Sequence, residues 1–79
     1  MATIVVKNDP VMIIDGTRQA LVTATDEFYY GFGDTLPETW HRYYTYKDAV
    51  VFGTEYGKVW VKKSAEPDTI VLNVSYVKA

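Results

Sequence analysis

The sequence predicts an all-β fold, a small antiparallel β-sandwich or jelly-roll-like barrel of seven to eight short strands, in one domain over residues 1–79. Apolar and polar residues alternate at every second position in several stretches, most clearly over residues 69–77. Clusters of Gly, Pro, Asn and Asp separate these stretches at a spacing of about ten residues. Aromatic residues make up 15% of the chain, and they favour strands.

The first half of the chain divides into four expected strands. Residues 3–7 are a β-branched run that stops at Asn-Asp-Pro, and residues 11–14 end at Asp15-Gly16, which suits a tight hairpin turn. We therefore expect a strand-turn-strand start. Apolar and polar residues alternate over residues 18–25, and a turn at residues 26–27 connects this strand to residues 28–32. In the second strand Gly31 predicts a bulge or a close approach of another backbone.

The middle of the chain combines a loop with an aromatic segment. Residues 33–39 are expected to form a loop. Their Leu-Pro-Glu-Thr run resembles the first four residues of a sortase sorting signal, but Trp40 replaces the glycine and no apolar tail follows, so we expect a turn. Residues 40–46 are a strand or, with Pro37 at a first helical position, one or two helical turns. Four aromatic residues and a threonine favour the strand. Residues 49–52 form the next expected strand.

The last two stretches, residues 57–63 and 69–77, read as a β-hairpin with a longer loop at residues 64–68. In each stretch one face is expected in the core and the other outside. The expected inward residues are Val59, Val61, Ile70, Leu72, Val74 and Tyr76, and the expected outward ones include Lys58, Trp60 and Lys62.

Composition excludes several classes of partner. The net charge is −2, from ten acidic and eight basic residues spread along the chain, so no basic field for nucleic acid or anionic lipid is present. No apolar run approaches the roughly 20 residues of a membrane span. The start shows no charged segment before an apolar core and no cleavage site, so we expect no signal peptide and synthesis in the cytoplasm.

Chemistry-bearing residues are scarce. The chain has no cysteine and one histidine, His41, which excludes Cys–His catalysis and zinc sites built from His and Cys. A Ser-His-Asp arrangement would need Ser64 or Ser75, and neither lies in an elbow motif. Neighbouring acids at the expected turns are more typical of turn capping than of calcium binding. We expect no enzyme, no metal and no cofactor.

A chain this short buries only about 60–65% of its unfolded surface, and without disulfides the common supplement is oligomerisation or docking on a partner. Trp and Tyr are enriched in interfaces. The candidate interface has two groups, one of Lys58, Trp60 and Lys62 with Tyr29 across the sheet, and one of Trp40, Arg42 and Tyr44. These rings suit a protein interface or stacking on a sugar or base; alternatively, Trp60 packs in a second layer under the lysine stems.

The N-terminal strand is a candidate strand-donating arm, because a terminal strand can pair with a neighbouring molecule. Pairing within its own sheet is the favoured alternative. The arm consists of Ala2, Thr3, Ile4, Val5 and Val6.

The order of motifs resembles a family of small virion structural proteins of tailed bacteriophages, of the decoration or cement type. The motifs are residues 10–16 with their Asp-Gly end, 18–25, the aromatic strand end at 27–33, 47–52, and Tyr-Gly-Lys-Val-Trp-Val at 56–61. Residues 36–46 depart from the pattern, being richer in aromatic residues.

The resemblance implies a compact, non-enzymatic β-sandwich located in the virion, with the major capsid protein or another virion protein as partner. It implies a homo-oligomer, with a trimer favoured, that binds and stabilises the assembled head. A collar, tail or head-fibre module is the alternative on the same particle. From another class, a carbohydrate-binding module would stack a sugar on Trp60, Trp40 or Tyr29.

Overall fold

The computed structural model describes residues 2–44, 48–65 and 67–77, and it confirms a small all-β sandwich. One 3-10 turn, Thr54–Tyr56, precedes the seventh strand. The strands are β1 (Ala2–Val6), β2 (Val11–Asp15), β3 (Ala20–Ala24), β4 (Phe28–Phe32), β5 (His41–Tyr43), β6 (Val50–Phe52), β7 (Lys58–Lys63) and β8 (Ile70–Tyr76).

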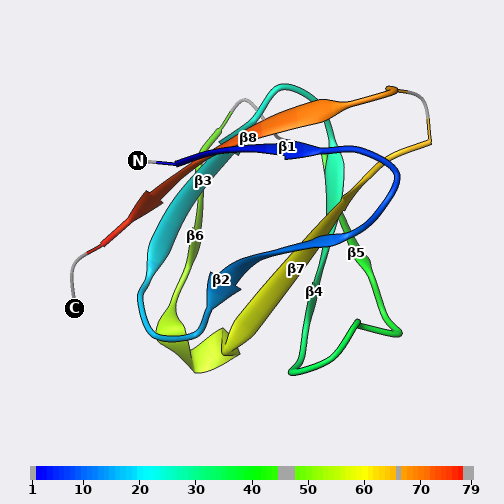
Figure 1. Ribbon diagram of the computed structural model, residues 1–79. Helices are drawn as coiled ribbons and strands as arrows, with labels where there is room; N and C mark the ends of the chain where they lie inside the picture. The colour runs from blue at the N-terminus through cyan, green and yellow to red at the C-terminus, as the bar shows by residue number, and fades with distance from the viewer. Residues whose placement is uncertain (1, 45–47, 66, 78–79) are drawn as a thin grey trace.

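The strands form two antiparallel sheets, in the orders β1-β8-β3-β6 and β2-β7-β4-β5, which we call sheet A and sheet B (Figure 1). The pairs β1–β8, β2–β7, β3–β6 and β4–β5 are the successive rungs of one long ribbon, with β4–β5 at its tip. The ribbon is rolled so that β3 also pairs with β8 and β4 with β7. Eight strands in two sheets with this connectivity form a jelly roll.

The hairpins expected over residues 57–77 and at the Asp15-Gly16 turn are wrong. Strands β7 and β8 lie in opposite sheets, as do β2 and β3, so these connections cross from one sheet to the other. Of the connections between consecutive strands among the described residues, only β4 to β5 stays within one sheet. The reason is that alternation fixes which face of a strand is apolar, and it leaves open whether the next strand lies beside it or across the core.

The core lies between the sheets and includes the inward-facing residues expected in β7 and β8, except that Tyr76 is only partly buried. Val59 and Val61 of β7 face Ile70, Leu72 and Val74 of β8, all with 0% exposure. The other buried hydrophobic residues are Val6, Ile13, Ile14, Ala20, Val22, Phe28 and Phe52. A register shift in β2 between Met12 and Ile14 allows the consecutive residues Ile13 and Ile14 both to be buried.

The Asp15-Gly16 turn leads from sheet B to sheet A instead of closing a hairpin. The backbone N–H and hydroxyl of Thr17 donate to Asp15 Oδ1 at 2.9 and 2.6 Å, which lowers the pKa of the Asp15 carboxyl. Gly16 has φ +90°, and a Cβ there would lie 3.0 Å from the carbonyl carbon of Gly57. The positive φ and the close approach together require glycine.

The structure also decides two alternatives in the middle of the chain. Residues 41–43 are a strand, as favoured, and residues 45–47 lie outside the described residues. Gly31 marks a close approach and not a bulge, because β4 keeps a regular register with β7 while Pro37 lies over it.

Candidate interaction surfaces

The seven residues of the predicted interface come together on the outer face of sheet B. Tyr29 of β4 lies in register with Lys62 of β7 on one side and with Arg42 of β5 on the other. The two groups that the sequence separates are therefore one surface. We call it the aromatic–cationic face; it contains Tyr29, Trp40, Arg42, Tyr44, Lys58, Trp60 and Lys62.

Rings and cations alternate across this face. The Lys62 ammonium lies 4.6 Å from the centre of the Trp40 ring and 5.6 Å from that of Tyr29. The Arg42 guanidinium lies 5.7 Å from the ring of Tyr44. Each separation is within the range of a cation–π attraction, so the cations and rings stabilise one another.

Two of the cations also have carboxylate partners. Arg42 donates from Nε and Nη2 to Glu27 Oε2 at 3.0 and 2.7 Å, and this hydrogen bonding raises the pKa of the guanidinium. Lys58 Nζ lies 3.9 Å from Asp34 Oδ1. Both pairs are exposed and contribute little to stability, so they mainly orient the side chains.

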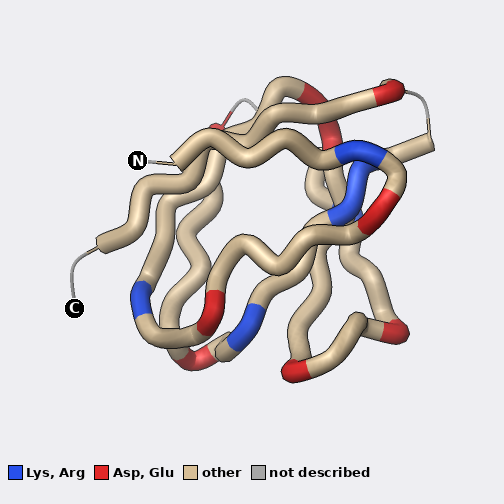
Figure 2. The backbone as a smooth tube through the Cα atoms, in the orientation of Figure 1, with Lys and Arg blue, Asp and Glu red and all other residues tan. Residues whose placement is uncertain are grey.

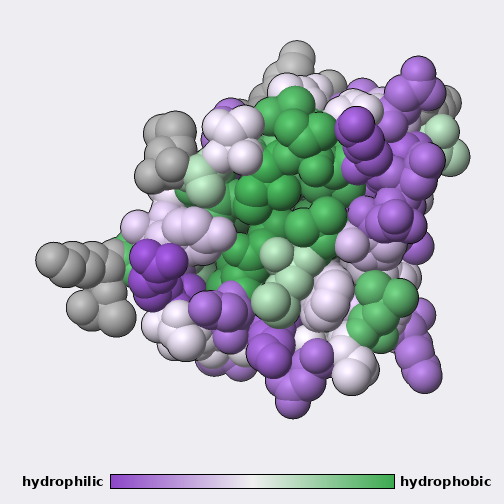
Figure 3. All heavy atoms as spheres, in the orientation of Figure 1, coloured by the Kyte–Doolittle hydropathy of each residue, from purple (hydrophilic) through white to green (hydrophobic). Residues whose placement is uncertain are grey.

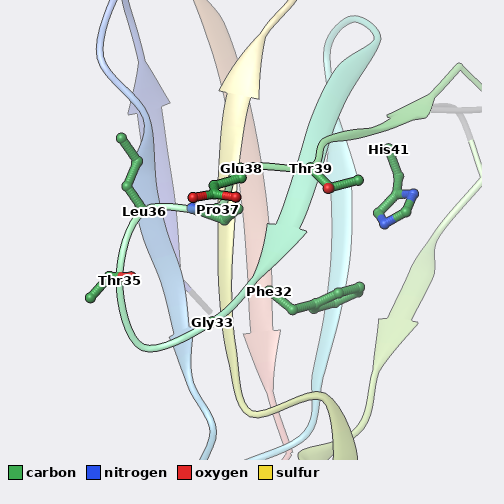
Figure 4. A pocket seen from close by; sticks show the side chains of 8 residues that line it. All are labelled: Phe32, Gly33, Thr35, Leu36, Pro37, Glu38, Thr39 and His41. Carbon is green, nitrogen blue, oxygen red and sulfur yellow. The ribbon is translucent and has the colours of Figure 1, made fainter.

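Trp60 is held by the loop between β4 and β5. Its indole N–H donates to the carbonyl oxygen of Gly33 at 3.0 Å, and a Cβ on the neighbouring Gly31 would lie 2.7 Å from Pro37 Cβ. Figure 4 shows the loop passing in front of the sheet, with Pro37 against the strands. The loop, together with Phe32 and His41, lines a hollow of about 370 Å³. Trp60 is therefore half-buried, with its indole N–H already paired to the loop, and whether it serves an interface stays a prediction.

A second hollow, of about 500 Å³, is lined in part by residues of the aromatic–cationic face, and we call it the Trp40 groove. It is lined by Asn8, Tyr29, Trp40, Lys62, Lys63, Ser64 and Ala65. Ser64 is 4% exposed, and among the described residues its hydroxyl oxygen has no hydrogen-bond partner. Leaving such a buried group unpaired costs about 1–3 kcal/mol. Tyr29 and Trp40 in this groove were predicted from the sequence as interface residues. Nothing in the sequence indicated that Asn8 and Ser64 would lie beside them.

The outer face of sheet A is different in kind, and sequence reasoning missed it. Strands β1, β3, β6 and β8 contain no charged residue, whereas sheet B and the loops carry charges (Figure 2). Val5 and Val51 are each 51% exposed, and Leu21 is 40% exposed. We call this surface the uncharged face; it consists of Thr3, Val5, Leu21, Thr23, Val51, Val71, Asn73 and Ser75. The absence of charge from these stretches was visible in the sequence, but their common sheet was not.

The predicted strand-donating arm is an edge of sheet A. All five residues of β1 pair with β8 in regular register, from Ala2 opposite Val74 to Val6 opposite Ile70, so the arm pairs within its own sheet. The other edge strands are protected: β2 has a bulge and ends in Asp15, and β5 and β6 have three residues each. Figure 3 shows hydrophobic residues gathered over β1 and β2, within a hydrophilic rim.

The residues considered for catalysis lie apart. The His41 ring packs 5.3 Å from the centre of Tyr30, Ser75 lies on the uncharged face, and Ser64 lines the Trp40 groove. Over residues 2–44, 48–65 and 67–77, no group of three His, Cys, Asp or Glu side chains is placed to hold a metal ion. In the same ranges, no helix is long and apolar enough to cross a membrane.

The architecture and these surfaces define the chain as a jelly-roll sandwich with two chemically different outer faces. Comparison with protein-family models, with curated proteins and with solved structures found no match.

Proposed function

We propose that the protein is a non-enzymatic structural protein of a phage particle, a decoration or cement protein that docks on the assembled head. The observation that carries this proposal is the uncharged face of sheet A. Its partner is the major capsid protein, and the location is the virion. The resemblance of the chain to small virion proteins supports the identity of the assembly, and the jelly roll is a fold that viral capsid domains use.

The uncharged face has the composition of an interface core. An antiparallel sheet with one solvated face normally carries polar and charged residues there, as sheet B does with Arg42, Lys58 and Lys62. Protein interfaces are depleted of charge at their centres. On sheet A, Val5 lies opposite Val71, and Leu21 lies opposite Val51, which gives the face exposed aliphatic pairs across neighbouring strands.

Docking of this kind stabilises a lattice by mass action. A protein that binds assembled capsid subunits and not free ones lowers the free energy of the assembled state. A homo-oligomer, with a trimer favoured, would place several uncharged faces around a symmetry axis of the head. Its small core is consistent with this role, because contact with the lattice would supply buried area that 79 residues alone do not.

The test is co-sedimentation of the purified protein with expanded heads of the phage that encodes it. We expect saturable binding with a fixed number of copies per capsid subunit. Leu21→Lys places a charge at the centre of the uncharged face and is expected to weaken head binding at least tenfold. The matched control is Leu36→Lys, which alters a 56% exposed leucine in the β4–β5 loop and should leave head binding unchanged.

The proposal fails if wild-type protein does not bind heads, or if the two lysine variants weaken binding equally. Binding to tails and not to heads would instead support the collar or tail module. Light scattering of the free protein tests the expected trimer separately from docking. A monomer that still bound heads would contradict the trimer and leave the docking proposal standing.

A further inference from the structure

The Trp40 groove presents two ammonium groups, those of Lys62 and Lys63, that have no carboxylate partner within the described ranges. Lys62 is held over the rings of Trp40 and Tyr29, and Lys63 Nζ donates to the carbonyl oxygen of Ser64 at 3.3 Å. The ion pairs among the described residues involve Arg42 and Lys58, and neither involves Lys62 or Lys63. Among the residues that the structure describes, none that lines the groove is acidic. An anion that enters the groove can therefore pair with these cations without displacing a carboxylate of the described residues.

The rest of the groove combines apolar rings with hydrogen-bonding groups. Tyr29 and Trp40 are half-buried, so part of each aromatic surface borders the hollow. Asn8 adds an amide, and Ser64 adds a buried hydroxyl that lacks a partner among the described residues. Ligand sites typically have this composition, with rings that contact the body of the ligand and a few polar groups that orient it.

We infer that the Trp40 groove binds an acidic sugar, a pyranose bearing a carboxylate, either free or within an acidic polysaccharide. The carboxylate pairs with the ammonium groups of Lys62 and Lys63 through charge-assisted hydrogen bonds. The sugar ring packs on the exposed part of Trp40, and its hydroxyls bond with Asn8 and Ser64. This ligand site lies on sheet B and is independent of the proposed docking face on sheet A.

A sugar fits these observations better than a nucleic acid. Single-stranded nucleic acid is held along grooves that neutralise several successive phosphates. The Trp40 groove offers two cations. The nearby Arg42, which is in register with Tyr29, is already paired with Glu27, and the whole chain has a net charge of −2. The site therefore suits a ligand with one carboxylate and an uncharged, hydroxyl-rich body.

The two tryptophans make a direct test possible. In the labelled full-length protein, each indole N–H gives its own NMR signal, and Trp40→Phe identifies which is which. Titration with glucuronate is expected to shift the Trp40 signal until it saturates, while the Trp60 signal, held by Gly33, stays nearly fixed. Glucose and acetate, each carrying half of the chemistry, are expected to bind at least tenfold more weakly. An acidic polysaccharide such as alginate should shift the same signal.

Matched variants separate the groove from the general charge of the face. Lys62→Gln is expected to weaken glucuronate binding at least tenfold, whereas Lys58→Gln, on the same strand and outside the groove, leaves it unchanged. Ser64→Ala removes a buried hydroxyl without a partner among the described residues, so it should stay folded and bind severalfold more weakly.

The inference is overturned if glucuronate leaves the Trp40 signal in place, if glucose or acetate binds as well, or if the two lysine variants behave alike. Tighter binding of a single-stranded oligonucleotide at the same signal would assign the groove to nucleic acid instead. None of these results depends on whether the protein docks on a phage head.

Discussion

Gly31 is the residue at which the β4–β5 loop meets sheet B. It has no side chain to separate β4 from the loop, so Pro37 can lie against the strand and the carbonyl of Gly33 can reach the indole of Trp60. A Cβ at position 31 would lie 2.7 and 2.8 Å from two carbons of Pro37 and 2.9 Å from the carbonyl oxygen of Thr39. These are backbone and ring atoms that cannot rotate away.

We therefore expect Gly31→Ala to destabilise the protein by about 1–3 kcal/mol, the usual cost of overpacking a tight contact. Gly53→Ala is the control, because the atoms nearest to the added methyl belong to the carboxylate end of Glu55, which can swing into solvent. Urea unfolding of both variants measures the difference in free energy of unfolding. Equal stability of the two variants would show that the loop does not rest on β4.

The sequence predicted part of this residue-level picture. The glycine inside an aromatic strand indicated a bulge or a close approach, and the structure shows the close approach. The partner of that approach was not predictable, because Pro37 is placed by the return of the loop to β5. In the same way Trp60 is recognisable as an outward residue, but its acceptor is a carbonyl 27 residues away in the chain.

Strands β7 and β8 show what alternation determines at the scale of an element. Their buried faces follow from the sequence, and the structure confirms both. Their pairing does not, because a short polar connection joins two strands equally well side by side or across a core. The neighbours of β8 are β1 and β3, which are distant in sequence, and sequence periodicity carries no information about them.

The chain has no cysteine, so paired cysteines can test this arrangement directly. Thr23→Cys with Asn73→Cys joins residues in register on β3 and β8, at a Cα separation typical of antiparallel pairs and suited to a disulfide. We expect this pair to oxidise readily and to raise the free energy of unfolding by roughly 2–4 kcal/mol. Thermal unfolding with and without reductant measures the gain.

The control pair is Lys62→Cys with Val71→Cys, which a β7–β8 hairpin would bring close together. In the jelly roll these side chains lie on the outer faces of opposite sheets, so this pair should stay reduced in the folded monomer. Rapid oxidation of the control pair, with no oxidation of the Thr23→Cys and Asn73→Cys pair, would contradict the jelly roll and support a β7–β8 hairpin.

At the scale of the whole molecule, rolling the ribbon places two different chemistries back to back. The aromatic–cationic face gathers residues from β4, β5 and β7 and from the loop before β5, and each was recognisable in the sequence as a ring or a cation. Their union into one surface depends on the β4–β5 and β4–β7 registers. The uncharged face needs the order β1-β8-β3-β6, which joins both ends of the chain to its middle.

Because the core separates the two faces, we expect them to act independently. Packed sheets lie about 10 Å apart, and substitutions at that distance without shared contacts are usually additive. Leu21→Lys should reduce head binding and leave glucuronate affinity unchanged, and Lys62→Gln should do the reverse. In the double variant, each assay should therefore give the value of the corresponding single variant.

Co-sedimentation with heads and the Trp40 NMR titration, run on the same four proteins, measure this directly, and thermal unfolding checks that all four are folded. A double variant that loses more in either assay than its single variant does would mean that the faces are coupled through the core. Independence would instead allow one small sandwich to hold a lattice with sheet A while it presents the Trp40 groove outward on sheet B.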